Sequence, residues 1–246
     1  CYVNKTWIGC VMYADDILLI TASVQNLQKL VTIAEKCFEE INLKFNVTKC
    51  TAMRIGKRCK VSCSNITLKD GLIPWNFEIK YLGVVLSQAS YLKINLHSNK
   101  VGFFRSFNGI FAKIGNSNNV DTIVELMKCN CLSVLLYCLE AVNLTKTDLN
   151  YLQFPLHRAF MKIFHVKDNV SIGWCQYYMH QMPIKLLLDA KKFNFYKKMS
   201  KSDCYLMQHL YAHAACNLFS DLTAKYNLNN NASIGRFRFE LWATFH

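Results

Sequence analysis

The hydrophobic pattern of the chain changes its period once, near residue 88, and this change limits what the chain can fold into. Before it, short apolar runs alternate with turn residues, as is typical of β-strands. Strand patterns cover residues 7–12 and 17–21, and shorter ones follow between residues 50 and 87, where Asp70-Gly71 is a hairpin turn signal. After residue 88 the period is helical. The sequence therefore predicts an α+β fold with an all-helical second part.

One amphipathic helix is predicted within the first part. Ser23 fits its N-cap, and apolar residues recur at helical spacing as far as Ile41. Pro155 predicts a kink or a break in one helix of the second part. The helices of that part are predicted at about residues 91–115, 120–142, 147–165, 183–200 and 203–226. Because no Gly/Pro/Ser-rich linker separates the two parts, we expect two packed subdomains, residues 1–88 and 89–246.

Charge and apolar content narrow the class of partner. The chain has 29 Lys and Arg against 16 Asp and Glu, a net charge of +13, which attracts polyanions such as nucleic acid. The same lysines could simply keep a chain that is 52% hydrophobic in solution. The longest apolar run without a charge, residues 129–139, is far shorter than the ~20 residues that cross a bilayer, and residues 1–12 lack the features of a secretory signal. We expect no membrane association, reduced cysteines and an intracellular location, nuclear or cytoplasmic.

Two adjacent aspartates, Asp15 and Asp16, lie between the first two predicted strands. Nucleotidyl transfer uses two divalent ions about 4 Å apart, and oxygen ligands hold such ions. Two carboxylates at a hairpin tip can supply these ligands while the apolar strands fix the tip. Asp also favours ordinary solvated turns, so the pair by itself leaves both interpretations open.

Three segments resemble motifs of one family. Tyr13-Ala14-Asp15-Asp16, followed by four aliphatic residues at 17–20, resembles the palm motif of reverse transcriptases, in the form found in non-LTR (LINE-type) retrotransposons and in group II introns. Residues 43–49 (LKFNVTK) resemble the element that follows the palm helix in LINE-type enzymes, although Cys50 stands where that family has Ser or Thr. Residues 79–83 (IKYLG) are similar to the next motif, a hairpin that grips the primer strand. The order and the spacing of the three segments agree with the family.

The resemblance implies roles for individual residues. Asp15 would ligate two Mg²⁺ ions, Asp16 would support the metal site, and Lys49 would lie near the leaving pyrophosphate, where a cation can offset negative charge. Lys49 could also be an ordinary solvated lysine. Contacts to the primer or the nucleotide are implied for Tyr13, Ala14, Asn46, Tyr81, Leu82 and Gly83. The implied partners are an RNA template, a DNA primer and deoxynucleoside triphosphates, and the oligomeric state is left open.

By the same resemblance, residues 1–88 would be part of a polymerase palm, and residues 89–246 a helical thumb with a C-terminal region. Thumb helices follow the nucleic-acid backbone through basic side chains. The candidates in the first predicted helix are Lys93, Lys100, Arg105 and Lys113. The phenylalanines of that helix are expected to pack in a core rather than to stack on bases, namely Phe103, Phe104, Phe107 and Phe111. His209, His213 and Cys216 share a predicted helix face, where we expect packing rather than a zinc site.

One part of the family pattern is missing from the sequence. A further palm Asp belongs on an earlier strand, but no acidic residue precedes Asp15. We therefore expect a fragment of a longer product that does not polymerise by itself. The alternatives are a group II intron maturase and a catalytically inactive retroelement relic that binds nucleic acid. The element with Asn46 and Lys49 favours the LINE type.

Overall fold

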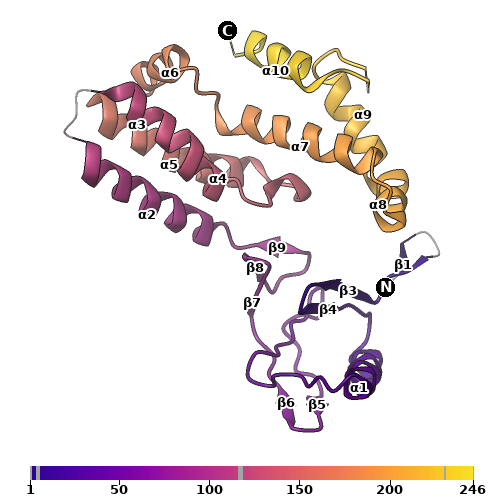
Figure 1. The fold of residues 1–246 in the computed structure, drawn as a ribbon. Coiled ribbons are helices and arrows are strands. Elements are labelled where there is room, and N and C mark those ends of the chain that lie inside the picture. The colour runs from indigo at the N-terminus through magenta and orange to yellow at the C-terminus, as the bar shows by residue number, and fades with distance from the viewer. Residues whose placement is uncertain (1, 4–5, 116–118, 230, 246) are drawn as a thin grey trace. The chain divides into compact units, whose positions relative to one another are not determined.

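The computed structural model describes residues 2–3, 6–115, 119–229 and 231–245. These residues form two compact units, Cys1–Asn95 and Leu96–His246 (Figure 1). The first unit combines antiparallel strands with one long helix, and the second is built from helices. The predicted α+β fold is confirmed.

The strands of the first unit pair as antiparallel hairpins. The pairs are β1 (Tyr2–Val3) with β2 (Thr6–Trp7), β3 (Cys10–Tyr13) with β4 (Asp16–Leu19), β5 (Ile66–Leu68) with β6 (Gly71–Ile73), and the sheet of β7 (Glu78–Tyr81), β8 (Val84–Ser87) and β9 (Lys93–Ile94). The hairpin predicted at Asp70-Gly71 is confirmed, with Lys69 and Asp70 as its turn and Gly71 already in a strand.

The only long helix described in residues 2–95 is α1 (Val24–Glu40). The predicted cap is confirmed, because Ser23 Oγ accepts a hydrogen bond of 3.2 Å from the Asn26 backbone N–H. The helix ends at Glu40, so Ile41, predicted on its apolar face, is exposed. Gln28 joins α1 to a strand edge, since its amide exchanges two hydrogen bonds with the backbone of Thr67.

The core of the first unit forms where α1 meets the short strands. Val31 of α1 is buried together with residues of the later hairpin and its flanks, namely Ala52, Ile66, Leu68 and Ile73. Leu19 at the end of β4 packs against this cluster, as do Val24 and Leu27 of α1. The β3–β4 hairpin is therefore fixed at its open end while its tip lies away from the core.

The second unit contains more helical segments than the sequence predicted. They are α2 (Leu96–Ile114), α3 (Val120–Leu126), α4 (Leu132–Leu135), α5 (Lys146–Phe164), α6 (Asn169–Tyr178), α7 (Ile184–Ser200), α8 (Tyr205–Leu210), α9 (Cys216–Ala224) and α10 (Ile234–Ala243). Two π-helical turns, η1 (Met127–Cys131) and η3 (Tyr211–Ala215), interrupt the predicted helices 120–142 and 203–226, and a 3₁₀ turn, η2 (Leu139–Ala141), follows α4. Helix α5 continues through Pro155, so the predicted break is wrong. Burial of Leu152, Pro155 and Leu156 compensates for the lost hydrogen bond.

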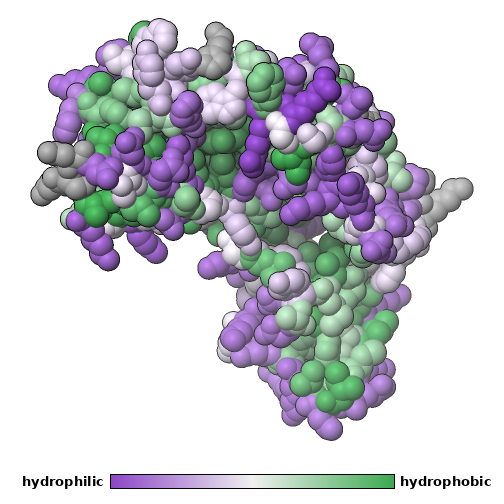
Figure 2. Space-filling model, turned by 45° about the horizontal axis from the view of Figure 1, so that its top comes forward, coloured by the Kyte–Doolittle hydropathy of each residue, from purple (hydrophilic) through white to green (hydrophobic). Residues whose placement is uncertain are grey.

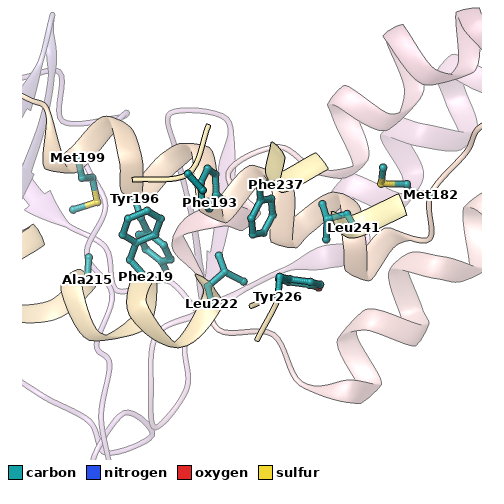
Figure 3. Packing of buried hydrophobic residues seen from close by; sticks show 11 residues of the cluster. Met182, Phe193, Tyr196, Met199, Ala215, Phe219, Leu222, Tyr226, Phe237 and Leu241 are labelled. Atoms are coloured by element: carbon teal, nitrogen blue, oxygen red, sulfur yellow. The ribbon is translucent and has the colours of Figure 1, made fainter. Parts of the chain in front are cut away.

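Aromatic side chains fill much of the second unit. Phe103 and Phe107 of α2 are buried, which confirms their predicted packing role. Phe193 of α7 stacks on Phe237 of α10 with ring centroids 4.1 Å apart (Figure 3). On the face drawn in Figure 2, polar and charged residues are interspersed with apolar ones. None of the helices described for this chain is long and apolar enough to cross a membrane.

Candidate metal and nucleic-acid site

The acidic pair lies at the tip of the β3–β4 hairpin. Tyr13 pairs with Asp16 across the strands, so Ala14 and Asp15 form a two-residue turn. Ala14 has a φ of +52°, in the left-handed region that L-residues rarely adopt. Both carboxylates are exposed, and neither forms a side-chain hydrogen bond or an ion pair with any residue that the structure describes. Their oxygens are therefore available to an external cation.

This pair can supply part of a divalent-metal site. Carboxylate oxygens are the hard ligands that Mg²⁺ prefers, and adjacent residues at a tight turn hold two of them near each other. Within the described residues, no group of three or more His, Cys, Asp or Glu side chains that could hold a metal ion occurs. The two carboxylates thus supply some, but not all, of the ligands that a divalent ion needs.

Asn46 and Lys49 lie in one tight turn. The Asn46 side chain accepts hydrogen bonds from the backbone N–H of Thr48 at 3.1 Å and from its hydroxyl at 2.6 Å. The Lys49 backbone N–H donates to the Asn46 carbonyl at 3.0 Å. Val47 packs against the core of the first unit, and the Lys49 side chain is exposed. Asn46 therefore builds the turn that presents Lys49, a structural role that the sequence analysis missed although Asn commonly forms such turns.

The segment predicted to touch the primer is a second tight hairpin. Tyr81 pairs with Val84, and the turn between them has φ values of +46° at Leu82 and +81° at Gly83. A two-residue turn with both φ positive joins antiparallel strands without splaying them. The sequence pattern predicts one strand over residues 81–86, and this prediction is wrong because the turn divides the segment. Tyr81 is half-buried, and its hydroxyl is buried without a hydrogen-bond partner among the described residues.

The four basic residues that were predicted on one helix do not all lie on the same helix. Lys93 lies in β9, paired with Ser87, and belongs to the first unit. Lys100, Arg105 and Lys113 lie on α2, where the last two are exposed. Lys100 is half-buried, and its ammonium lies 4.3 Å from the ring centroid of Tyr151 on α5, in a cation–π contact.

The His/Cys face of the sequence is altered by the π-helical turn η3. The rings of His209 and His213 lie with centroids 4.5 Å apart. Between His209 and Cys216 the chain passes through residues 211–215, which have π-helical rather than α-helical spacing. His209 and His213 thus remain adjacent, whereas the α-helical i+7 spacing assumed for Cys216 is not kept.

Sequence comparison agrees with the resemblance seen in the motifs. Residues 3–86 match the family model of reverse transcriptase (RNA-dependent DNA polymerase), a segment that includes the acidic hairpin, the Asn46 turn and the Tyr81 hairpin. The matched segment makes up about a third of the chain. A curated relative, the RNA-directed DNA polymerase from mobile element jockey of Drosophila funebris, is 26% identical over 161 residues, which cover 61% of this chain and 17% of that protein. Together these matches bear out the predicted resemblance to a LINE-type reverse transcriptase. The chain spans less than a fifth of the length of that relative, and no solved structure matches it.

Proposed function

We propose that the chain forms part of the palm and thumb of an RNA-directed DNA polymerase that extends a DNA primer on an RNA template. Asp15 ligates divalent ions, and Asp16 supports the same site. The observation that carries this proposal is the position of both carboxylates at an exposed turn, free of ion pairs with the described residues. The same turn lies within residues 3–86, which match the reverse transcriptase family model.

The residues around the two carboxylates bind and orient the nucleotide and the primer. Bound Mg²⁺ supplies activation of the attacking oxygen and charge neutralisation at the leaving phosphate. Lys49, presented by the Asn46 turn, offsets the charge of the pyrophosphate. The nucleotide and the primer are held by Tyr13, Ala14, Asn46, Tyr81, Leu82 and Gly83. The helical residues 89–246 act as the thumb, with Arg105 and Lys113 as exposed contacts for phosphates.

We also propose that the 246-residue chain does not polymerise by itself. A two-metal site needs more ligands than two neighbouring carboxylates, and the sequence has no acidic residue before Asp15. The purified chain is expected to give no extension of a DNA primer on an RNA template with deoxynucleoside triphosphates and Mg²⁺. Template-directed extension that Asp15→Asn abolishes would contradict this.

Metal binding tests the site separately from polymerisation. Mn²⁺ is titrated into the isotopically labelled chain, and paramagnetic broadening of backbone NMR signals is followed. Broadening is expected first at residues 13–17, and Asp15→Asn should remove it. The matched control is Asp70→Asn, which deletes the same charge from the turn of the β5–β6 hairpin. Equal broadening at both hairpins, or broadening that survives Asp15→Asn, would refute the proposed site.

A further inference from the structure

A groove in the second unit lies between α2 and α5, which run side by side (Figure 1). It has a volume of about 580 Å³. Helix α2 contributes Phe104, Phe107 and Asn108, and the end of α5 with the residues after it contributes Arg158, Met161, Lys162, His165, Val166 and Lys167. The groove is separate from the acidic hairpin, which belongs to the first unit.

The charge of this groove is positive and uncompensated. Arg158, Lys162 and Lys167 are exposed, and the lining includes no acidic residue. None of the three forms an ion pair with a residue that the structure describes. Other lysines of the same unit do pair with carboxylates, at 2.7 Å in Lys128–Glu125 and 2.5 Å in Lys225–Asp189. Three neighbouring cations without counter-charges favour the binding of an anion.

The acidic residue nearest in sequence to these cations is Asp168, and its carboxylate caps a helix. Asp168 follows Lys167 directly, but its carboxylate accepts a hydrogen bond of 2.7 Å from the Ser171 backbone N–H at the start of α6. That hydrogen bond holds the pKa of Asp168 below its usual range. Asp168 thus serves as a helix cap and does not line the groove.

Aromatic rings lie beside one of the three cations, Lys162. Phe107 is buried, whereas Phe104 is half-buried and lines the groove. The Lys162 ammonium lies 4.4 Å from the ring centroid of Phe111 and 5.9 Å from that of Phe107. Cations that follow a backbone, next to an aromatic ring that a base can stack on, are the two elements of single-strand recognition. An acidic peptide would use the charges but leave the ring without a function.

We propose that this groove binds the sugar-phosphate backbone of a single nucleic-acid strand. Its phosphates contact Arg158, Lys162 and Lys167, and one unpaired base stacks on Phe104. This inference rests on the proposed function, because it names a second contact for the strands that the polymerase handles. The strand is single rather than duplex because the groove is concave and stacking on Phe104 needs an unpaired base.

The test uses the full 246-residue chain and a fluorescein-labelled 12-nucleotide RNA, with affinity measured by anisotropy at several salt concentrations. The groove variant carries Arg158→Gln, Lys162→Gln and Lys167→Gln. It is expected to bind at least about tenfold more weakly at physiological salt. The slope of log affinity against log salt should fall by about 2, since each phosphate contact on a single strand contributes about 0.7. The matched control loses the same charge at exposed lysines of α7 and its end, through Lys185→Gln, Lys198→Gln and Lys201→Gln.

Four results would overturn the proposal. Two concern the variants: unchanged RNA affinity in the groove variant, or an equal loss of affinity in the groove variant and the control. Two concern the ligand: an equal loss of affinity for single-stranded and duplex RNA, or displacement of the RNA by polyglutamate at equal charge concentration. Lys167 lies outside both α5 and α6, so the single variant Lys167→Gln should fold and give part of the loss even if the triple variant unfolds. Phe104→Leu keeps an apolar side chain and should weaken RNA binding about fivefold without changing the salt slope. RNA affinity of the groove variants and Mn²⁺ broadening at residues 13–17 are separate measurements, so failure of the metal site and failure of the groove give different results.

Discussion

Ala14 occupies the strained position of the acidic hairpin, and replacing it tests that strain. Its φ of +52° costs an L-residue roughly 1–2 kcal/mol. Ala14 is exposed, so its methyl group contributes little packing to offset this cost. Glycine relieves the strain but loses about 0.5–1 kcal/mol through the larger entropy of the unfolded chain. Ala14→Gly should therefore stabilise the hairpin by roughly 0.5–1 kcal/mol. Ala14→Val should destabilise it, because a β-branched residue tolerates positive φ least.

Hydrogen exchange followed by mass spectrometry measures this effect in the segment that contains β3 and β4. A change of 0.5–1 kcal/mol corresponds to exchange that is about two to five times slower. The matched control is Ala22→Gly, at an exposed alanine between β4 and α1 whose φ is not positive. There the entropy loss has no relief of strain to offset it, so exchange should be unchanged or faster. If Ala14→Gly accelerates exchange as much as Ala22→Gly does, the reasoning about strain is wrong.

Three further predictions concern the helical unit. The Tyr226 hydroxyl donates to the largely buried Asp189 carboxylate at 2.6 Å, so Tyr226→Phe should cost about 1–2 kcal/mol in urea unfolding, and Asp189→Ala more, because it leaves that hydroxyl unsatisfied. Burial lowers the pKa of His157, so the unfolded chain takes up the proton first. Stability should therefore fall as the pH drops below about 6.5, and the melting temperature should depend less on pH between 7.5 and 5.5 in His157→Gln. An equal pH dependence in the variant and the unchanged chain would contradict this. Burial raises the pKa of Cys131 to about 11, so alkylation at pH 8 should be at least about tenfold slower there than at the exposed Cys129, as mass spectrometry of the peptides would show.

The acidic hairpin could be predicted from sequence because its determinants are local. Apolar strands on each side of two aspartates, followed by a serine cap, specify strand, turn, strand and helix within about 30 residues. The helix predicted from residue 91 failed at its start for the opposite reason. Residues 93–94 pair with β8, and this pairing depends on a strand that the local period does not reveal.

The rest of the candidate site depends on contacts that sequence patterns do not contain. The role of Asn46 is a local turn that the resemblance to a nucleotide-binding element obscured. The groove between α2 and α5 joins residues about 50 positions apart, so the alignment of Phe104 with Arg158 and Lys162 follows from helix packing alone. The π-helical turns are likewise invisible to a search that assumes a period of 3.6.

The two hairpins that the resemblance assigns to the primer share one turn design. In each, a tyrosine ends the first strand, and the first residue of the two-residue turn is a non-glycine residue with positive φ. This residue is Ala14 in one hairpin and Leu82 in the other. The remaining non-glycine residues with positive φ among the described residues flank helical segments: Asn42, Cys138, His165, His180 and Asn227. The β5–β6 hairpin, to which no substrate contact is assigned, turns at Lys69 and Asp70 without any positive φ. Among the two-residue hairpin turns that the structure describes, positive φ at a non-glycine residue thus occurs in these two and not in the β5–β6 turn. Because strain at a turn lowers stability, this favours a role in presenting the neighbouring side chains.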